Sequence, residues 1–244
     1  MPKLLLFYLV IFLSNIIQCI TGFAGTVLAM PFSLMLVGYA TAKPILNVLG
    51  IAASIGVLLN NYRYVDKSEF FKIVVVMSIG IGGGMFISPH ITANPDWIEK
   101  ILGAVVIFFA AYNAFIFFKK KNKEPNKVLS FLLLAGAGLI HGLFVCGGPL
   151  LVTYASSKIK DTRKFRATIS AVWVVLNSII LFVDIKDGYF TPRIIPNLTV
   201  CMVLLFLALI VGEKLAKKLS KNAFMILSYV LMFDSGISLL VDFS

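Results

Sequence analysis

Residues 128–157 read VLSFLLLAGAGLIHGLFVCGGPLLVTYASS and contain no Asp, Glu, Lys or Arg. One crossing of a bilayer takes about 20 apolar residues, so these 30 are too many for one span and too few for two. The sequence Cys146-Gly147-Gly148-Pro149 interrupts the stretch. We therefore predict one helix over 128–145 and a second over 148–157, too short to cross. Lipid offers no partner to backbone amides, so every apolar run is expected to be helical.

The composition extends this prediction to the whole chain. Of its 244 residues, 59% are hydrophobic and 14% are charged, against roughly 45–50% and about 25% in soluble domains. The mean hydropathy is +0.96. A chain of this size has too little interior to bury so much apolar surface, so a water-soluble globular protein is excluded.

Ten apolar runs divide into two sets of five around the polar segment KKKNKEPNK at 119–127. We predict a first membrane repeat over 1–118, a cytoplasmic linker over 119–127 and a second membrane repeat over 128–244. The runs are 4–20, 23–38, 44–60, 70–90 and 97–118 in the first half, and 128–145, 148–157, 167–184, 194–212 and 222–241 in the second.

Basic residues divide unequally between the two sides of the predicted membrane. Loops after the odd-numbered runs hold 17 of the 22 Lys and Arg residues, and the opposite side holds five. Basic loops stay in the cytoplasm, so both termini are predicted to lie outside. Topology thus explains the net charge of +11, and no nucleic-acid partner is expected.

Because five is an odd number, the second half enters the membrane upside down relative to the first. The predicted fold class is an all-α polytopic membrane protein with two inverted-topology five-segment repeats, as in many secondary transporters. We expect each repeat to open with a broken or re-entrant helix pair, with uncharged, glycine-rich tips at 21–26 and 145–149.

The two tips suggest a binding site for an anion. Glycine permits a sharp turn and a close approach of ligand to backbone. A helix that restarts after the turn directs its N–H groups and its positive dipole end inward. The alternative is that these glycines only let helices pack closely. Packing is the expectation for the glycines at 80 and 82–84, which lie in no tip.

Sliding the chain by 123 residues aligns polar positions within the two halves. Lys43 and Asn47 fall on Arg166 and Ser170, and in each case the base and its polar partner are four residues apart, on one helix face. The other aligned pairs are Gln18 with His141, Gly25 with Gly148, and Ser54 with Asn177.

Backbone contacts to the anion are predicted for four tip residues, of which Thr26 can add a hydroxyl donor or cap its helix. The others are Gly25, Gly147 and Gly148.

Ionisable and amide side chains inside apolar runs are further candidates. His141 is predicted either to bind the anion or carry a coupling proton, or to be a neutral group bonded to a neighbouring helix, and Gln18 is its counterpart as a neutral donor. Asp234 is expected either to pair with a buried base or to take part in proton coupling. Asn47, Ser170 and Asn177 are predicted to line the cavity or to bond helix to helix.

Two bases begin apolar runs at opposite faces of the predicted membrane. Arg166 suits an oxyanion because its guanidinium can bind two oxygens. Lys43 is the matching candidate, although interfacial anchoring by snorkelling is the favoured reading of its position.

Enzymatic and metal chemistry find no support in the sequence. The three cysteines, Cys19, Cys146 and Cys201, form no CxxC motif and no Cys/His pair with zinc spacing. The chain has no nucleophile–base–acid set and no phosphate-binding loop. We therefore predict no catalytic residues, no metal and no cofactor.

Residues 141–150, HGLFVCGGPL, followed by 165–168, FRAT, resemble the second-repeat signature of the TauE/SafE family of sulfite and sulfonate exporters, also called toluene-sulfonate uptake permeases. Residues 22–31 and Ala42-Lys43 resemble the first-repeat signature. The first tip, GFAGT, departs from a family pattern that is usually richer in glycine.

The resemblance implies transport of small anions, often oxidised sulfur species or organosulfonates, across the bacterial inner membrane. We predict an alternating-access exporter of sulfite or a small organosulfonate, whose partners are that anion and the lipid bilayer. Uptake of such an anion or another small anion is an alternative. A non-transporting scaffold subunit is another.

Overall fold

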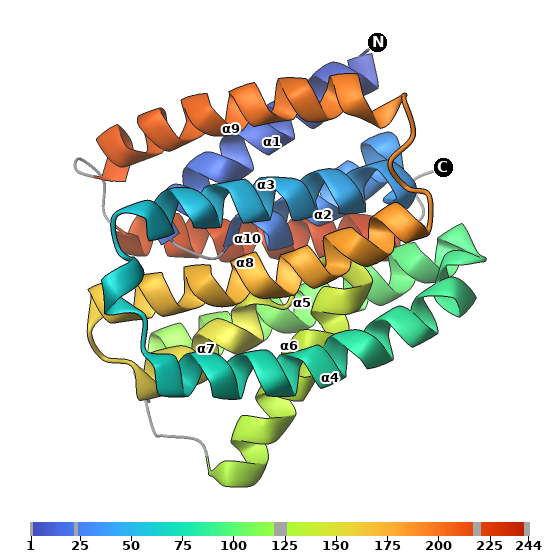
Figure 1. The fold of residues 1–244 in the computed structure, drawn as a ribbon. Coiled ribbons are helices and arrows are strands. Elements are labelled where there is room, and N and C mark those ends of the chain that lie inside the picture. The colour runs from blue at the N-terminus through green and yellow to red at the C-terminus, as the bar shows by residue number, and fades with distance from the viewer. Residues whose placement is uncertain (1, 22–23, 120–125, 217–220, 242–244) are drawn as a thin grey trace.

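A computed structural model of the chain describes residues 2–21, 24–119, 126–216 and 221–241. These residues form ten α-helices and one short 3-10 helix, with no strand in the described ranges (Figure 1). The helices are α1 (Pro2–Thr21), α2 (Ala24–Val37), α3 (Tyr39–Leu59), η1 (Tyr62–Tyr64), α4 (Lys67–Thr92), α5 (Pro95–Lys119), α6 (Lys127–Phe144), α7 (Gly148–Lys158), α8 (Thr162–Lys186), α9 (Ile194–Ala216) and α10 (Lys221–Leu240).

The all-helical, multi-pass architecture predicted from the sequence is confirmed. Each predicted apolar run corresponds to one helix, and seven helices are long and apolar enough to cross a membrane: α1, α3, α4, α5, α6, α8 and α9. Helix α7 has 11 residues, a length of about 16 Å, which is too short to cross. Residues 22–23 of the first tip and 120–125 of the predicted linker lie outside the described residues.

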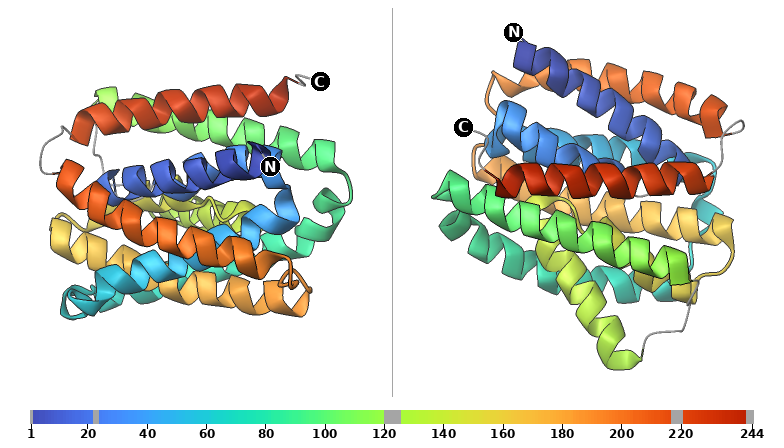
Figure 2. Two further views of the ribbon diagram at one scale, coloured as in Figure 1. Left: turned by 90° about the horizontal axis from the view of Figure 1, so that it is seen from above. Right: turned by 180° about the vertical axis from the view of Figure 1, so that it is seen from behind.

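The helices run roughly along one direction, as a membrane bundle requires. Figure 1 shows that α1 begins, and α4, α8 and α10 end, at one end of the bundle, whereas α3, α5 and α9 end at the other. The most extensive packing joins α4 to α6, α5 to α10, α1 to α9, α1 to α2 and α3 to α8. Figure 2 shows α5 and α10 side by side on one outer face.

The two short helices α2 and α7 lie deep in the bundle. Val27, Ala29 and Met30 of α2 are fully buried, as are Leu151 and Ala155 of α7. The two helices also contact each other. The long helices therefore enclose both short ones.

Side-chain caps fix the starts of three long helices at one end of the bundle. A side-chain oxygen of Asp66, Asn126 or Asp161 accepts the N–H three residues on, at the start of α4, α6 and α8. Such caps satisfy an N–H group that the helix itself leaves free.

Glycines bring α4 and α6 into close backbone contact. A Cβ atom at Gly80 would lie 2.3 Å from the Ala135 carbonyl oxygen, and one at Gly84 would lie 2.3 Å from that of Leu139. Among the described residues, nothing outside the nearby backbone of α4 lies within 4 Å of the corresponding positions at Gly82 and Gly83. The packing role predicted for this cluster is therefore confirmed for Gly80 and Gly84 only.

We expect Gly80→Ala to lower the apparent melting temperature in detergent, because backbone must shift to admit the methyl group, at a cost of about 1–3 kcal/mol. Gly82→Ala on the same helix is the control and should melt at or above the wild-type temperature, since alanine favours the helix. A Gly80→Ala protein as stable as the wild type would contradict this packing.

Candidate functional site

The first helix break, between α1 and α2, is held by Gln18. The Gly25 N–H at the start of α2 donates to Gln18 Oε1 over 2.7 Å. A Cβ atom at Gly25 would lie 2.5 Å from Gln18 Cβ and 2.9 Å from the Ser14 carbonyl oxygen. Only glycine fits between the restarting helix and α1 here.

The second break, between α6 and α7, follows the same plan. Helix α6 ends at Phe144, and Val145 adopts the left-handed conformation, with φ 56° and ψ 28°. This conformation is strained for a β-branched residue. The Gly147 N–H then donates to His141 Nδ1 over 3.4 Å. A Cβ atom at Gly147 would lie 2.2 Å from the Ala137 carbonyl oxygen.

These contacts assign a neutral imidazole to His141. Because Nδ1 accepts from Gly147, the ring hydrogen lies on Nε2, which donates to Asn177 Oδ1 over 2.6 Å. The indole of Trp173 packs on the ring, with centroids 4.5 Å apart. His141 therefore bonds a helix break to a neighbouring helix, which is one of the two roles the sequence allows.

The two breaks lie next to each other in the bundle. The Cys146 thiol donates to the Phe144 carbonyl oxygen over 3.1 Å and lies 3.7 Å from that of Thr26, in the first turn of α2. Segments about 120 residues apart in sequence thus meet at their glycine-rich turns.

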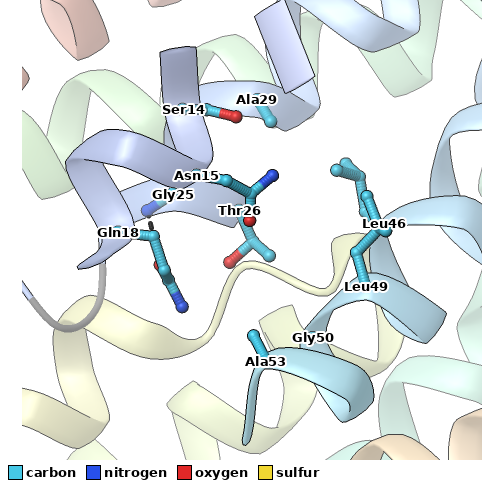
Figure 3. Close-up of a pocket in the computed structure, with 10 residues that line it drawn as sticks. All are labelled: Ser14, Asn15, Gln18, Gly25, Thr26, Ala29, Leu46, Leu49, Gly50 and Ala53. Carbon is cyan, nitrogen blue, oxygen red and sulfur yellow. Dashed lines mark hydrogen bonds between the residues drawn. The ribbon is translucent and has the colours of Figure 1, made fainter. Parts of the chain in front are cut away.

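A small cavity lined by both polar and apolar residues lies beside the first break. Figure 3 shows α1 and α2 residues, among them Gln18, Gly25 and Thr26, facing residues of α3 across this space. Its volume of about 10 Å³ is the room of about one water molecule. The lining residues are Ser14, Asn15, Gln18, Gly25, Thr26, Ala29, Leu46, Leu49, Gly50 and Ala53, none of them acidic.

A group of polar residues, here called the polar ladder, lies between α3 and α8 next to this cavity. It consists of Asn47, Ser54, Ser170 and Asn177. Asn47 Nδ2 donates to the Asn177 carbonyl oxygen over 3.0 Å. A Cβ atom at Gly50 would lie 2.7 Å from Asn177 Nδ2, so a glycine gives this amide its space. Ser54 and Ser170 are also buried on these helices. The predicted polar residues of the two helices therefore lie in the interior.

The predicted interfacial anchoring of Lys43 is wrong. Lys43 is 3% exposed, and its Nζ lies 2.7 Å from Oδ1 of Asp184, which is fully buried. The rings of Tyr39 and Tyr189 lie 5.8 and 5.5 Å from the ammonium. Because Lys43 pairs with the Asp184 carboxylate of α8, its side chain points into the bundle and not toward the membrane surface.

The remaining candidate residues, Gly148, Arg166 and Asp234, differ in their exposure. Gly148 is buried at the first position of α7. Arg166 is exposed near the start of α8, away from the ladder. Asp234 is exposed on α10, on the side opposite the buried Met232 and Ser235, and forms no ion pair within the described ranges. The ion pair predicted as one role for Asp234 is therefore not found there.

Sequence reasoning missed Asp184, Tyr39 and Trp173. Asp184 had a usable signal, because it is an acid at the end of an apolar run, where an unpaired charge is costly. The two aromatic residues had none, because aromatic side chains are ordinary in membrane helices.

Taken together, these features define a polytopic membrane protein with a polar site inside its helix bundle. The chain matches the family model described as Sulfite exporter TauE/SafE over residues 7–239, nearly its whole length. It therefore belongs to this family of membrane transporters. Among curated proteins and among solved structures, no match was found.

We expect Lys43→Gln and Asp184→Asn each to lower stability by about 3–5 kcal/mol, because each leaves one buried group without its partner. The double variant should lose less than either single variant, because no buried charge remains. Melting temperatures of the three proteins in detergent test this. Equal melting of the wild type and both single variants would show that the pair is not buried.

Proposed function

We propose that this protein exports sulfite or a small organosulfonate across the bacterial inner membrane by alternating access, with the anion held beside the two helix breaks. The observation that carries this proposal is the contact of the two breaks next to a cavity lined by Thr26 and Gln18. Membership of the exporter family supports the transported class.

The chemistry of the cavity favours an anion. Thr26 offers a hydroxyl donor and Gln18 offers its amide N–H groups, whereas Ser14 Oγ and Asn15 Nδ2 already donate to the Ile11 carbonyl oxygen. Helices α2 and α7 start beside the two breaks, which brings the positive ends of their dipoles there. The N–H groups of Gly25 and Gly147 already donate within the protein. The proposed donors to the anion are therefore the cavity side chains and the backbone N–H groups that follow these two glycines.

The small size of the cavity supports a binding site that widens during the transport cycle. A space for about one water molecule is too small for a sulfur oxyanion, so α3 must separate from the two breaks to admit one. Alternating access supplies such a movement between two rigid parts.

The two five-helix halves are proposed to be inverted repeats that intertwine, because α4 packs on α6, α1 on α9 and α5 on α10. If α1 to α5 correspond to α6 to α10, the contact of α1 with α9 corresponds to that of α6 with α4, and the contact of α2 with α10 corresponds to that of α7 with α5. Both members of each pair are present. The matching roles of Gln18 and His141 at the two breaks support the same correspondence. With the basic loops in the cytoplasm, both termini would lie outside.

Exchange of radiolabelled sulfite or methanesulfonate in proteoliposomes tests the function. We expect saturable exchange by the wild type. Thr26→Val should reduce exchange at least about tenfold, because a hydrogen bond to a charged group contributes about 1.5–3 kcal/mol.

Thr199→Val is the matched control, because this exposed hydroxyl on α9 bonds only to its own helix, at the Ile195 carbonyl, and exchange should not change. Absence of exchange by the wild type with any sulfur oxyanion or sulfonate would favour the scaffold alternative. Full activity of Thr26→Val would move the site elsewhere.

A further inference from the structure

The ion pair between Lys43 and Asp184 has features that a plain structural contact does not need. Both side chains are buried, and the second carboxylate oxygen of Asp184, Oδ2, is buried without a hydrogen-bond partner. An unsatisfied buried carboxylate oxygen is costly. A proton bound there would remove the carboxylate charge and would leave Lys43 without its partner until an anion binds.

We propose that Asp184 is the proton-coupling carboxylate of the transport cycle, and that its protonation frees Lys43 to bind the substrate anion. This inference rests on the proposed transport of an anion. Because the proton and the anion move in the same direction, export takes place down an outward gradient of the anion and carries a proton out with it, whereas an inward proton gradient drives uptake. The proton comes from the aqueous side and binds a carboxylate oxygen of Asp184. Lys43 keeps its positive charge throughout and exchanges one negative partner for another.

Charge balance explains why the two partners exclude each other. With Asp184 ionised, Lys43 and Asp184 sum to zero, and an added monovalent anion would leave a buried net charge of minus one. With Asp184 protonated, Lys43 and the anion sum to zero. Burial of an uncompensated charge is strongly unfavourable, so the anion and the proton bind together.

Lys43 and the cavity lie along one face of α3. Lys43 precedes Gly50, which lines the cavity, by seven residues, or about two helical turns, so both lie on one face of α3. Tyr39, which packs against the ammonium, donates its hydroxyl to the Leu143 carbonyl oxygen in the last turn of α6. Its ring packs edge-on against Phe144, with centroids 6.4 Å apart. Tyr39 therefore contacts both the ion pair and the last turn of α6, which precedes the second helix break.

The opposite end of the bundle has no equivalent pair in the described residues. The 123-residue offset places Arg166 opposite Lys43 and Asn61 opposite Asp184. Arg166 is exposed, and the neutral Asn61 side chain, in the turn after α3, donates to the Val57 carbonyl in the last turn of that helix. Within the described residues, the positions that match the Lys43–Asp184 pair therefore hold no second ion pair.

Other charged and titratable groups near Asp184 are accounted for. Lys43 and Tyr39 face it from α3, and Asp187 and Tyr189 follow it in the chain. The other two coupling candidates fit less well. His141 uses both ring nitrogens at the helix break, and Asp234 is exposed on the outer side of α10.

Proton movement in proteoliposomes tests the inference directly. Methanesulfonate is the probe, because it remains ionised across the working pH range, and sulfite with protein-free liposomes as baseline is the second probe. A pH dye inside wild-type proteoliposomes should report one proton entering per methanesulfonate. An imposed proton gradient, acidic outside, should drive accumulation of the anion inside.

In Asp184→Asn the neutral amide imitates the protonated acid. We expect this variant to retain methanesulfonate exchange at equal pH, but to lose gradient-driven accumulation to the level of protein-free liposomes. Methanesulfonate should also raise its melting temperature more than that of the wild type, because Lys43 has no competing carboxylate. Asp96→Asn, an exposed position in the first turn of α5, is the control and should behave as the wild type.

Exchange by the wild type without any proton movement would overturn the inference and leave the proposed function intact. Gradient-driven accumulation by Asp184→Asn at the wild-type level would overturn it as well. Absence of all exchange by the wild type would overturn the proposed function and this inference together. Because the proton count uses the wild type, the test does not depend on the folding of any variant.

Discussion

The structure depends on the constraint that lipid cannot satisfy a free backbone N–H. Each of the two helix breaks leaves backbone N–H groups without a helical partner inside the bundle. In each case a side chain of the preceding helix accepts a hydrogen bond from one of them. Gln18 accepts the N–H of Gly25, and His141 accepts the N–H of Gly147. These contacts fix where α2 and α7 restart, and so bring the turn at Cys146 against Thr26.

From this arrangement follows the chemistry of the interior. His141 holds Asn177 of α8, and the Asn177 carbonyl holds Asn47 of α3. The same two helices carry Lys43 and Asp184 further along. Hydrogen bonds therefore connect the second helix break to α8 and α3, and the buried ion pair lies on the same two helices.

Sequence reasoning predicted the helices and the two breaks because hydropathy and glycine content fix both. It also paired Gln18 with His141, because the 123-residue offset can be read from the sequence without knowing where the side chains point. It did not predict that Lys43 turns inward to Asp184, which lies 141 residues away in sequence. Nor did it predict that Arg166 is exposed. Helix rotation and long-range pairing decide such contacts, and one sequence contains neither.

Thiol cross-linking of the two breaks tests the central claim most directly. In a Cys19→Ser, Cys201→Ser background, Thr26→Cys is paired with the native Cys146 in membranes and treated with a short bifunctional thiol reagent. We predict one intramolecular cross-link, detected as a single linker mass and the loss of both thiols. Thr199→Cys is the control and should give none with Cys146. Independent labelling of Cys146 and Thr26→Cys, without a cross-link, would contradict the meeting of the two breaks.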